Sequence, residues 1–570
     1  MNIWSTFQTK PMNYKSLLLV IYLCCFASLV HSQPVLEIVY QQKNNGKIDS
    51  VNTYRFRFFK NVAFLSTETS DTREFIDFNR KELVDIMRFN NVAYKTITPF
   101  SETDQPVFTN NTEKILGFNC SKAIYKSFSN TIEVWYTTET VIKGSPYKNF
   151  LPENSLVMKI VINGNRTLEA VSIHSLSDDT LPDYPYQLAT PISKSQAREL
   201  QIKSRYTHVN VFNKQVINFG DSIKNPEFGF TDSTYRFSNG TVILKKIALP
   251  EINKKGGSVF ATITNWSNGD AYDRTCSLFT IAGDKEKTIL DALQNGVETM
   301  PIIMDKNGEK YQGFISTAEY EVPVELMRFF TSFGVSHFNK LREINNYNWQ
   351  DSVVYKQEIT ALVPNTRSDL WIGIFIGNYD KGGHKVSLDL QFYPPWDNAP
   401  VAEKWIKPLF NTVNILEMSG QNYGRLFKTD TLSTEFELPP HINGLQLLFT
   451  STGHGGWGGG DEFNPKLNQI FIDGNLIFSH TPWRTDCATY RMSNPASGNF
   501  ENGLSSSDLS RSNWCPATLT PPWFIPLTNL APGNHHISIV INQGENEGDS
   551  FSHWAVTGVL TGNISANQPQ

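Results

Sequence analysis

Short hydrophobic runs, separated by turn residues, cover most of the chain. Examples are the runs at residues 157–162, 241–244, 386–390 and 537–541. Their length and their content of β-branched residues are typical of strands. Asn-Gly and Asp-Gly pairs at Asn163, Asp473 and Asn502 are typical of hairpin turns. The pattern predicts an all-β protein built from stacked β-sandwiches, because strands do not alternate regularly with helices.

Few segments have the spacing of an amphipathic helix. The best candidates are residues 80–89, 290–300 and 324–333.

Two breaks divide the chain, which at 570 residues is too long for one hydrophobic core. A charged stretch at residues 197–205 ends where an extended apolar pattern begins, and a proline-rich bridge lies at residues 393–400. We therefore expect three domains, at residues 33–205, 206–395 and 396–563, and a polar tail at 564–570.

Residues 1–32 are predicted to be an export signal that is removed. Lys10 and Lys15 precede an apolar run at residues 17–30, and small residues follow before Gln33. No later apolar run is long enough to span a membrane. We expect a secreted or periplasmic protein with no membrane partner.

Composition narrows the classes of partner and cofactor. The net charge is -5 and no basic block occurs, which argues against nucleic acid. Aromatic residues make up 12% of the chain and supply flat faces that suit sugar rings. Four cysteines follow the signal, and export permits disulfides among them in three pairings. Their spacing is not that of a zinc site, so neither a metal nor another cofactor is expected.

A polar loop that leads into an apolar strand contains the first candidate site. Asp273 and Arg274 lie where the loop meets the strand, so a rigid element would present the acid. The alternative is an ordinary ion pair at a strand edge.

A glycine-rich loop at residues 449–465 contains the second candidate. It includes His454 and Trp457 and ends in the acidic pair Asp461-Glu462. Long loops inside compact domains are usually functional, although a flexible loop with solvated acids is the simpler alternative.

The third candidate is Arg511, which lies close to Trp514 and Cys515. The arginine would orient a carboxylate and the tryptophan would stack on a sugar. A disulfide between Cys487 and Cys515 would close a loop and fix Arg511. The alternative is a surface arginine beside a structural disulfide.

These segments together resemble the bacterial peptide-N-glycosidase F family over residues 208–563. The family's opening strand resembles residues 211–221, and its Trp-Asp-Arg with a catalytic aspartate resembles Tyr272-Asp273-Arg274. Further similar segments are Ile406-Lys407-Pro408-Leu409-Phe410 and Tyr423-Gly424-Arg425. The family's Ala-Glu-Trp, with its second key acid, matches Asp461-Glu462-Phe463, and its Arg-Ala-Gly-Trp-Cys-Pro matches the run from Arg511 to Pro516.

The chain departs from the family at three points. The family's Thr-Glu-Thr-Trp corresponds to residues 370–380, which contain no glutamate, and Tyr379 or Asp380 is the candidate replacement. The family's Gly-Trp-Gly-His is Ser-Thr-Gly-His here, so Trp457 would supply the missing ring from a shifted position. The family's small disulfide around its catalytic glutamate is absent. These changes bear on sugar preference.

The resemblance implies two adjacent jelly-roll sandwiches with the active site at their interface, preceded by an additional N-terminal domain. It implies a monomeric amidase that cuts the bond between asparagine and the first sugar of N-linked glycoproteins and glycopeptides. Asp273 and Glu462 would be its catalytic acids, and Arg274 and Arg511 would orient them. The predicted substrate-binding residues are Tyr272, Tyr379, Asp380, His454, Trp457 and Trp514.

Three rival functions compete with this interpretation. A non-catalytic glycan-binding β-sandwich would use the same aromatic loops. Paired carboxylates are also typical of glycosidases, and residue types alone do not separate the two hydrolyses. A copper monooxygenase would need histidine clusters, and His535-His536 is the only adjacent pair.

Overall fold

The structure is a computed structural model that describes residues 34–66, 72–152, 154–177, 183–220, 223–229, 232–281, 285–397, 400–455, 460–546 and 551–564. The predicted signal, residues 565–570 of the predicted tail and Trp457 lie outside the described residues. The chain divides into two compact units, Met1–Ser204 and Arg205–Gln570. Among the described residues, no helix is both long enough and apolar enough to cross a membrane.

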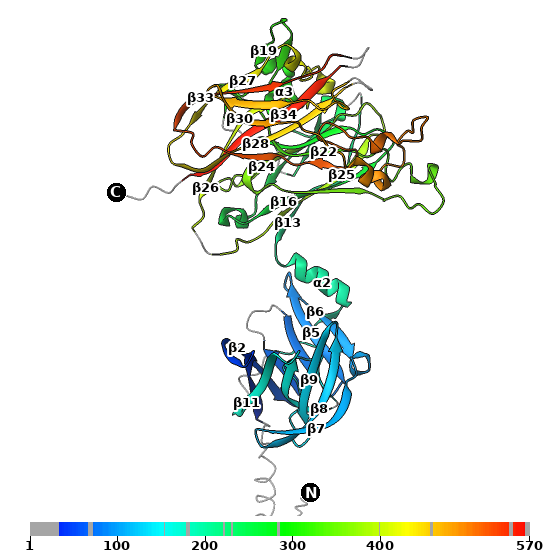
Figure 1. Cartoon of the computed structure of the whole chain (residues 1–570), viewed down its shortest axis with the longest axis vertical. Helices are drawn as coiled ribbons and strands as arrows, with labels where there is room; N and C mark the ends of the chain where they lie inside the picture. The colour runs from blue at the N-terminus through cyan, green and yellow to red at the C-terminus, as the bar shows by residue number, and fades with distance from the viewer. Residues whose placement is uncertain are drawn as a thin grey trace, which may run out of the picture. The chain divides into compact units, whose positions relative to one another are not determined.

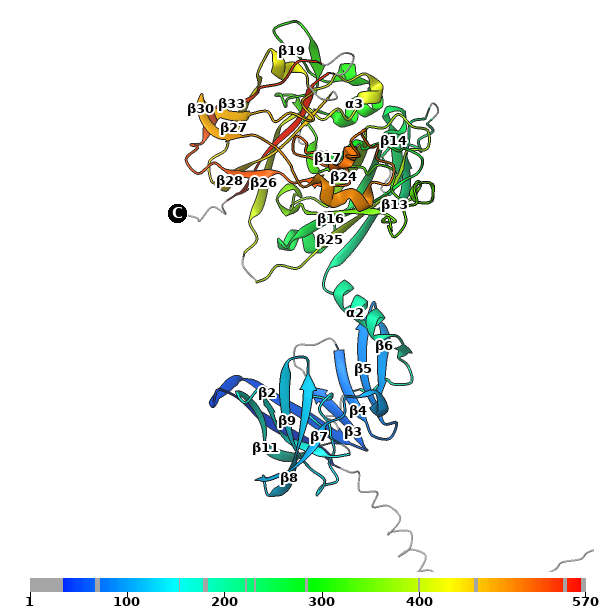
Figure 2. The same ribbon diagram turned by 45° about the vertical axis from the view of Figure 1, so that its right-hand side comes forward.

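The first unit is one twelve-stranded sheet around its own core. Figure 2 shows β2 to β6 following one another across part of the sheet. The full order is β12-β6-β5-β4-β3-β2-β1-β11-β10-β9-β8-β7. The bounds are β1 Val35–Asn44, β2 Lys47–Phe59, β3 Val62–Ser66, β4 Thr72–Asp77, β5 Glu82–Phe89, β6 Val92–Pro99, β7 Val107–Ile115, β8 Phe118–Ser127, β9 Asn130–Thr137, β10 Leu156–Ile162, β11 Arg166–Leu176, β12 Thr190–Pro191 and helix α2 Lys194–Lys203.

The second unit begins with a sandwich of two sheets. The four-stranded sheet has the order β13-β25-β16-β23, and the six-stranded sheet has the order β14-β15-β24-β17-β22-β31. The bounds are β13 Thr207–Ile217, β14 Thr234–Phe237, β15 Val242–Ala248, β16 Val259–Ser267, β17 Thr275–Ile281, β22 Val324–Phe330, β23 Val353–Glu358, β24 Asp369–Ile376, β25 His384–Phe392 and β31 Leu519–Thr520. Between β17 and β22 lie β18 Lys287–Thr288, helix α3 Ile289–Asn295, β19 Ile302–Met304, β20 Lys310–Gln312 and β21 Tyr320–Glu321.

A second sandwich follows, with sheet orders β26-β34-β28-β32 and β27-β33-β29-β30. In Figure 1 the long strands β26, β28 and β34 run side by side. The bounds are β26 Glu403–Asn411, β27 Leu432–Leu438, β28 Ile442–His454, β29 Asn468–Ile472, β30 Asn475–His480, β32 Trp523–Pro526, β33 Gly533–Ile541 and β34 His553–Ile564. The all-β class and the two jelly-roll sandwiches, preceded in the chain by an additional N-terminal domain, are confirmed.

The two sandwiches share buried contacts. Leu448 and Val559 of the second sandwich belong to the hydrophobic core of the first. Arg328 of β22, which is 1% exposed, hydrogen-bonds Thr452 Oγ1 of β28 at 2.8 Å and the Ala555 carbonyl of β34 at 2.9 Å. The same guanidinium forms two hydrogen bonds to Glu325. A charged pair therefore ties the sheets together at the place where the sandwiches meet.

Two of the predicted helices are wrong. Residues 82–89 form strand β5, which ends at a hairpin turn in which Asn90 and Asn91 have φ of 48° and 63°. Such a turn matches the twist of paired strands. Residues 324–330 form β22, in which every residue is buried, so the alternation that marks a strand is absent. Of residues 290–300, only the first part is α-helical, in α3, and a short 3₁₀ turn at Val297–Thr299 follows.

We expect Arg328→Met to lower the free energy of unfolding by roughly 3–5 kcal/mol, because Glu325 would stay buried without its counter-charge. Denaturant titration followed by fluorescence measures the loss. The double variant Glu325→Gln/Arg328→Met removes both charges and should recover most of it. A single variant as stable as the unaltered protein would contradict the bridging role of this pair.

Candidate functional site

Asp273 and Glu462 meet at one arginine. Asp273 lies in the loop between β16 and β17, and Glu462 lies between β28 and β29. Arg511 follows the 3₁₀ turn Ser506–Asp508 and is 1% exposed. Its Nη1 lies 3.2 Å from Asp273 Oδ2 and donates a hydrogen bond to Glu462 Oε1. One guanidinium thus bridges two carboxylates from distant parts of the chain.

Arg511 is held from several sides. Its backbone pairs with that of Arg484, and its Nη2 donates to the Ser506 carbonyl at 2.9 Å. The rings of Phe463 and Trp514 pack against the guanidinium at 5.0 and 4.5 Å. The Cys487–Cys515 disulfide closes the segment that contains it. The position of the charge is therefore fixed before any substrate arrives.

The segment that bears Glu462 is anchored by its neighbour Asp461. The buried Asp461 carboxylate accepts a hydrogen bond from Trp554 Nε1 at 2.7 Å and another from the Gly544 backbone at 2.9 Å. Ser512 donates through its hydroxyl to the Asp461 carbonyl and through its backbone to the Glu462 carbonyl. The backbone that carries Glu462 is therefore held by Ser512, the residue after Arg511 in the chain, and by Trp554 of β34.

Burial controls the protonation of the two acids. It raises the pKa of Glu462 to about 7, against the pull of Arg511 and with a further push from Asp273. Burial also raises the pKa of Asp273, and the charge of Arg511 only partly offsets this. Because one positive charge faces two carboxylates, the pair retains a proton more readily than free acids do.

Arg274 pairs with Asp270 in the structure, whereas the sequence predicted that it orients the catalytic carboxylates. Its Nε lies 2.8 Å from Asp270 Oδ2 and its Nη2 lies 3.2 Å from Oδ1. Asp270 also accepts the backbone N–H of Tyr272 at 3.1 Å. Burial alone would raise the pKa of Asp270, but His384 and Arg274 outweigh it and lower it to about 2. This ion pair shapes the loop that presents Asp273.

Three predicted substrate-binding residues have mainly structural contacts. Trp514 is 3% exposed, stacks on Phe330 and donates through Nε1 to the Gly453 carbonyl. His454 is buried, which lowers its pKa well below the usual value, and its Nε2 lies 2.9 Å from Thr452 Oγ1. Asp380 accepts the backbone N–H groups of a turn at Gly382 and Gly383. Tyr272, by contrast, is 61% exposed.

A third acid lies close to the pair, and the sequence pattern did not reveal it. Glu417 belongs to the 3₁₀ turn Glu417–Ser419, and its Oε1 accepts hydrogen bonds from the hydroxyls of both Tyr379 and Tyr423. Those hydroxyls also lie 2.9 Å from each other. Burial and then Glu417 raise the pKa of Tyr379 to about 12, so this tyrosine remains a hydroxyl donor.

Two cavities meet at the acid pair. The larger, about 610 Å³, is lined by Asp273 and Glu462 together with Tyr272, Phe338 and other aromatic residues. The smaller, about 230 Å³, is lined by the same two acids together with Tyr379, Glu417 and Trp514. The acids therefore lie where two different chemical groups can approach them from two sides.

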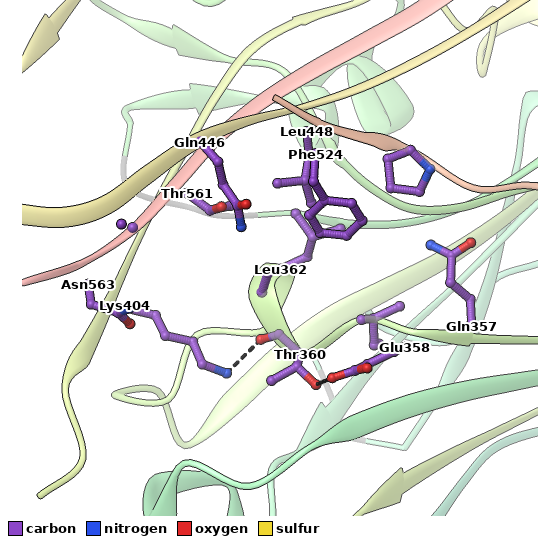
Figure 3. A pocket seen from close by; sticks show the side chains of 15 residues that line it. Gln357, Glu358, Thr360, Leu362, Lys404, Gln446, Leu448, Phe524, Thr561 and Asn563 are labelled. Carbon is purple, nitrogen blue, oxygen red and sulfur yellow. Dashed lines mark hydrogen bonds between the residues drawn. The ribbon is translucent and has the colours of Figure 1, made fainter. Parts of the chain in front are cut away.

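A further cavity, of about 360 Å³, shares no lining residue with these two and contains Lys404, shown in Figure 3. The Lys404 ammonium donates to the Thr360 carbonyl at 2.6 Å, and burial lowers its pKa to about 8. The amine is committed to the backbone carbonyls of Thr360 and Val363, and Glu358, which also lines the cavity, accepts a hydrogen bond from the Thr360 hydroxyl at 2.7 Å. The acid pair is the better candidate for chemistry.

No metal centre is evident among the described residues. Asp486 lies beside Cys487 and Cys515, but both sulfurs are used in the disulfide, so this group offers a cation only a carboxylate. The rival copper interpretation depended on the pair His535-His536. Both ring nitrogens of His535 are already used, because Nδ1 lies 2.7 Å from Asp473 Oδ2 and Nε2 lies 2.7 Å from the Ala531 carbonyl.

We expect Glu462→Gln to be more stable than the unaltered protein at pH 8. The pKa of Glu462 rises from about 4.5 to about 7 on folding, so the folded state binds its proton more tightly than the unfolded state. Stability from this group is present below about pH 4.5 and is lost as the pH rises through 7. The neutral amide avoids that loss, and the advantage should shrink toward pH 5 in thermal melts.

Asp270→Asn is the matched control with the opposite sign. The pKa of Asp270 falls to about 2 on folding, so its contribution is present above about pH 4 and is lost only as the pH falls toward 2. This variant should be less stable than the unaltered protein at pH 8. A Glu462→Gln variant that melts below the unaltered protein at pH 8 would contradict the raised pKa of Glu462.

The family models for peptide-N-glycosidase F match the chain at residues 208–392 for the N-terminal part and 422–561 for the C-terminal part. The model for the N-glycanase N-terminal domain, named for PNGase F-II, matches residues 38–187. No curated protein matches the chain.

Two crystal forms of PNGF-II are 39% and 40% identical to the chain, with TM-scores of 0.85 and 0.83, and each match covers 94% of this chain and 100% of that one. The structure of PNGase F, a glycosylasparaginase from Flavobacterium meningosepticum, is 15% identical over 63% of this chain and 96% of its own, with a TM-score of 0.42. The chain belongs to the peptide-N-glycosidase F family, in the form that has the additional N-terminal domain.

Proposed function

We propose that this protein is a peptide-N4-(N-acetyl-β-glucosaminyl)asparagine amidase, which hydrolyses the side-chain amide of a glycosylated asparagine and releases the intact glycan. The observation that supports it most is the pair Asp273 and Glu462, held on Arg511 where two cavities meet. The bond to be cut joins a peptide to a sugar. The group that attacks it therefore needs space for the peptide on one side and for the sugar on the other, and the two cavities supply this space.

In this proposal Asp273 activates the water. Its carboxylate accepts a proton as the water oxygen bonds to the amide carbon. The C–N bond then breaks, and the proton passes to the leaving nitrogen. The asparagine becomes aspartate, and the glycosylamine decays in water to ammonia and free glycan. Arg511 offsets the negative charge that develops beside it, and Glu462 binds hydroxyls of the core sugar.

A covalent route has less support. Cys276 is fully buried, and burial raises the pKa of its thiol well above the usual value. Thr452, the hydroxyl beside His454, is also fully buried and accepts a hydrogen bond from Arg328. Neither group offers a nucleophile that an amide carbon can reach.

The proposed substrates are N-linked glycoproteins and glycopeptides, and the protein is proposed to act as an exported monomer without a cofactor. A binding protein of the same fold is the alternative. It would bind the same glycans through the aromatic side of the larger cavity and leave the amide intact.

Mass spectrometry of a denatured N-glycoprotein tests the proposal. Amide hydrolysis converts asparagine to aspartate and leaves the deglycosylated peptide about 1 Da heavier than its asparagine form. In water enriched in heavy oxygen the new carboxylate acquires the label. Asp273→Asn should lose roughly 10²- to 10⁴-fold in kcat/KM, whereas Asp473→Asn, at an exposed hairpin turn, should keep full activity. A peptide that retains one sugar would indicate a glycosidase, and an unchanged glycopeptide would indicate the binding protein.

We further expect Glu417 to act as the third acid of the site. Glu417→Gln keeps the shape but removes the charge that orients Tyr379 and Tyr423, and kcat/KM should fall by roughly 100-fold. Tyr379→Phe should cost less, about tenfold, because Tyr423 still holds the carboxylate. Glu437→Gln on the exposed face of β27 is the control. Steady-state rates on one glycopeptide measure all three, and an unimpaired Glu417→Gln enzyme would remove this acid from the site.

A further inference from the structure

Asn414 has an unusual environment for a buried amide. It is 7% exposed, and neither its Oδ1 nor its Nδ2 has a hydrogen-bond partner within the protein. The residue lines the smaller cavity at the acid pair, together with Asp273 and Glu462. An unpaired buried amide costs free energy, so in a native structure it needs a reason, and a binding site supplies one.

The backbone around Asn414 is firmly held. Thr412 donates through its backbone to the Val556 carbonyl and through its hydroxyl to the Trp554 carbonyl, both of β34. Val413 and Leu416 donate their backbone N–H groups to the side chains of Asn411 and Gln421. The unpaired amide is therefore displayed on a rigid segment, and the same segment continues into Glu417.

The cavity also contains apolar residues. Phe375, Val413 and Ala555 line it together with Asn414 and are 2%, 2% and 5% exposed. A carboxamide N–H donor near apolar side chains matches a group that has both a carbonyl acceptor and a methyl. An acetamido substituent has both, whereas a sugar hydroxyl has no methyl to place against the apolar residues.

We propose that Asn414 recognises the 2-acetamido group of the sugar attached to asparagine. Its Nδ2 donates to the acetamido carbonyl, its Oδ1 accepts from a hydroxyl of the same sugar, and the methyl packs on Val413 and Ala555. This assignment rests on the proposed function. It makes the smaller cavity the sugar side of the scissile bond and leaves the larger, aromatic cavity for the peptide.

The test compares two synthetic glycopeptides, one with N-acetylglucosamine on asparagine and one with glucose, which has a hydroxyl in place of the acetamido group. The unaltered enzyme should prefer the first by on the order of 100-fold in kcat/KM, because the second lacks the carbonyl that pairs with Asn414 Nδ2 and the methyl that packs on Val413 and Ala555. Asn414→Leu keeps the volume of the side chain without its polar atoms. Its rate should drop on the acetamido substrate but not on the glucosyl substrate, so the preference falls toward unity.

An Asn414→Leu enzyme that loses equal activity on both substrates, or that keeps the full preference, would overturn the assignment. Saturation-transfer NMR with the Asp273→Asn protein separates this result from a failure of the amidase proposal, because it needs no turnover. There the acetamido methyl of N-acetylglucosamine should receive strong saturation, and the added Asn414→Leu change should remove it. An unchanged methyl signal also contradicts the role of Asn414.

Discussion

One guanidinium lies between two largely buried carboxylates, and much of the second unit serves to hold it there. Arg511 contacts Asp273 and Glu462, packs on Trp514 and lies within the segment that the Cys487–Cys515 disulfide closes. With two negative groups and one positive group, the cluster is not neutral when both acids are ionised. Burial raises the pKa of both acids, and a cleft group with a strongly shifted pKa is a candidate for acid–base chemistry.

Three buried acids near the site have a different role, because each is paired. Asp270 is matched by Arg274, and Glu325 is matched by Arg328. Asp461 accepts hydrogen bonds from Trp554 and Gly544. Asp270 and Asp461 fix the segments that carry Asp273 and Glu462, and the Glu325–Arg328 pair joins β22 to β28 and β34. These paired acids differ from Asp273 and Glu462, which share one arginine, and this difference separates the proposed reacting centre from the residues that support it.

Strand patterns, turn pairs and the overall class could be predicted from the sequence, because alternation and Asn-Gly turns are local signals. Residues 324–330 could not, since a strand buried on both faces has no alternation to detect. The resemblance pointed to Asp273, Glu462 and Arg511, which the structure places together. Glu417 and Asn414 could not be found in the same way, because tertiary packing alone brings their segment against Tyr379, Tyr423 and β34.

The order of strands has a consequence for biosynthesis. In the first unit most neighbouring strands are also consecutive in the chain. Each strand can therefore pair with the one before it as the chain emerges from the ribosome. In the second unit β34 lies between β26 and β28, and Trp554 of β34 holds Asp461 beside Glu462. The acid pair is therefore completed only when almost the whole chain has been synthesised. A chain that lacks β34 lacks the contact that holds Asp461, and its proposed reacting centre is incomplete.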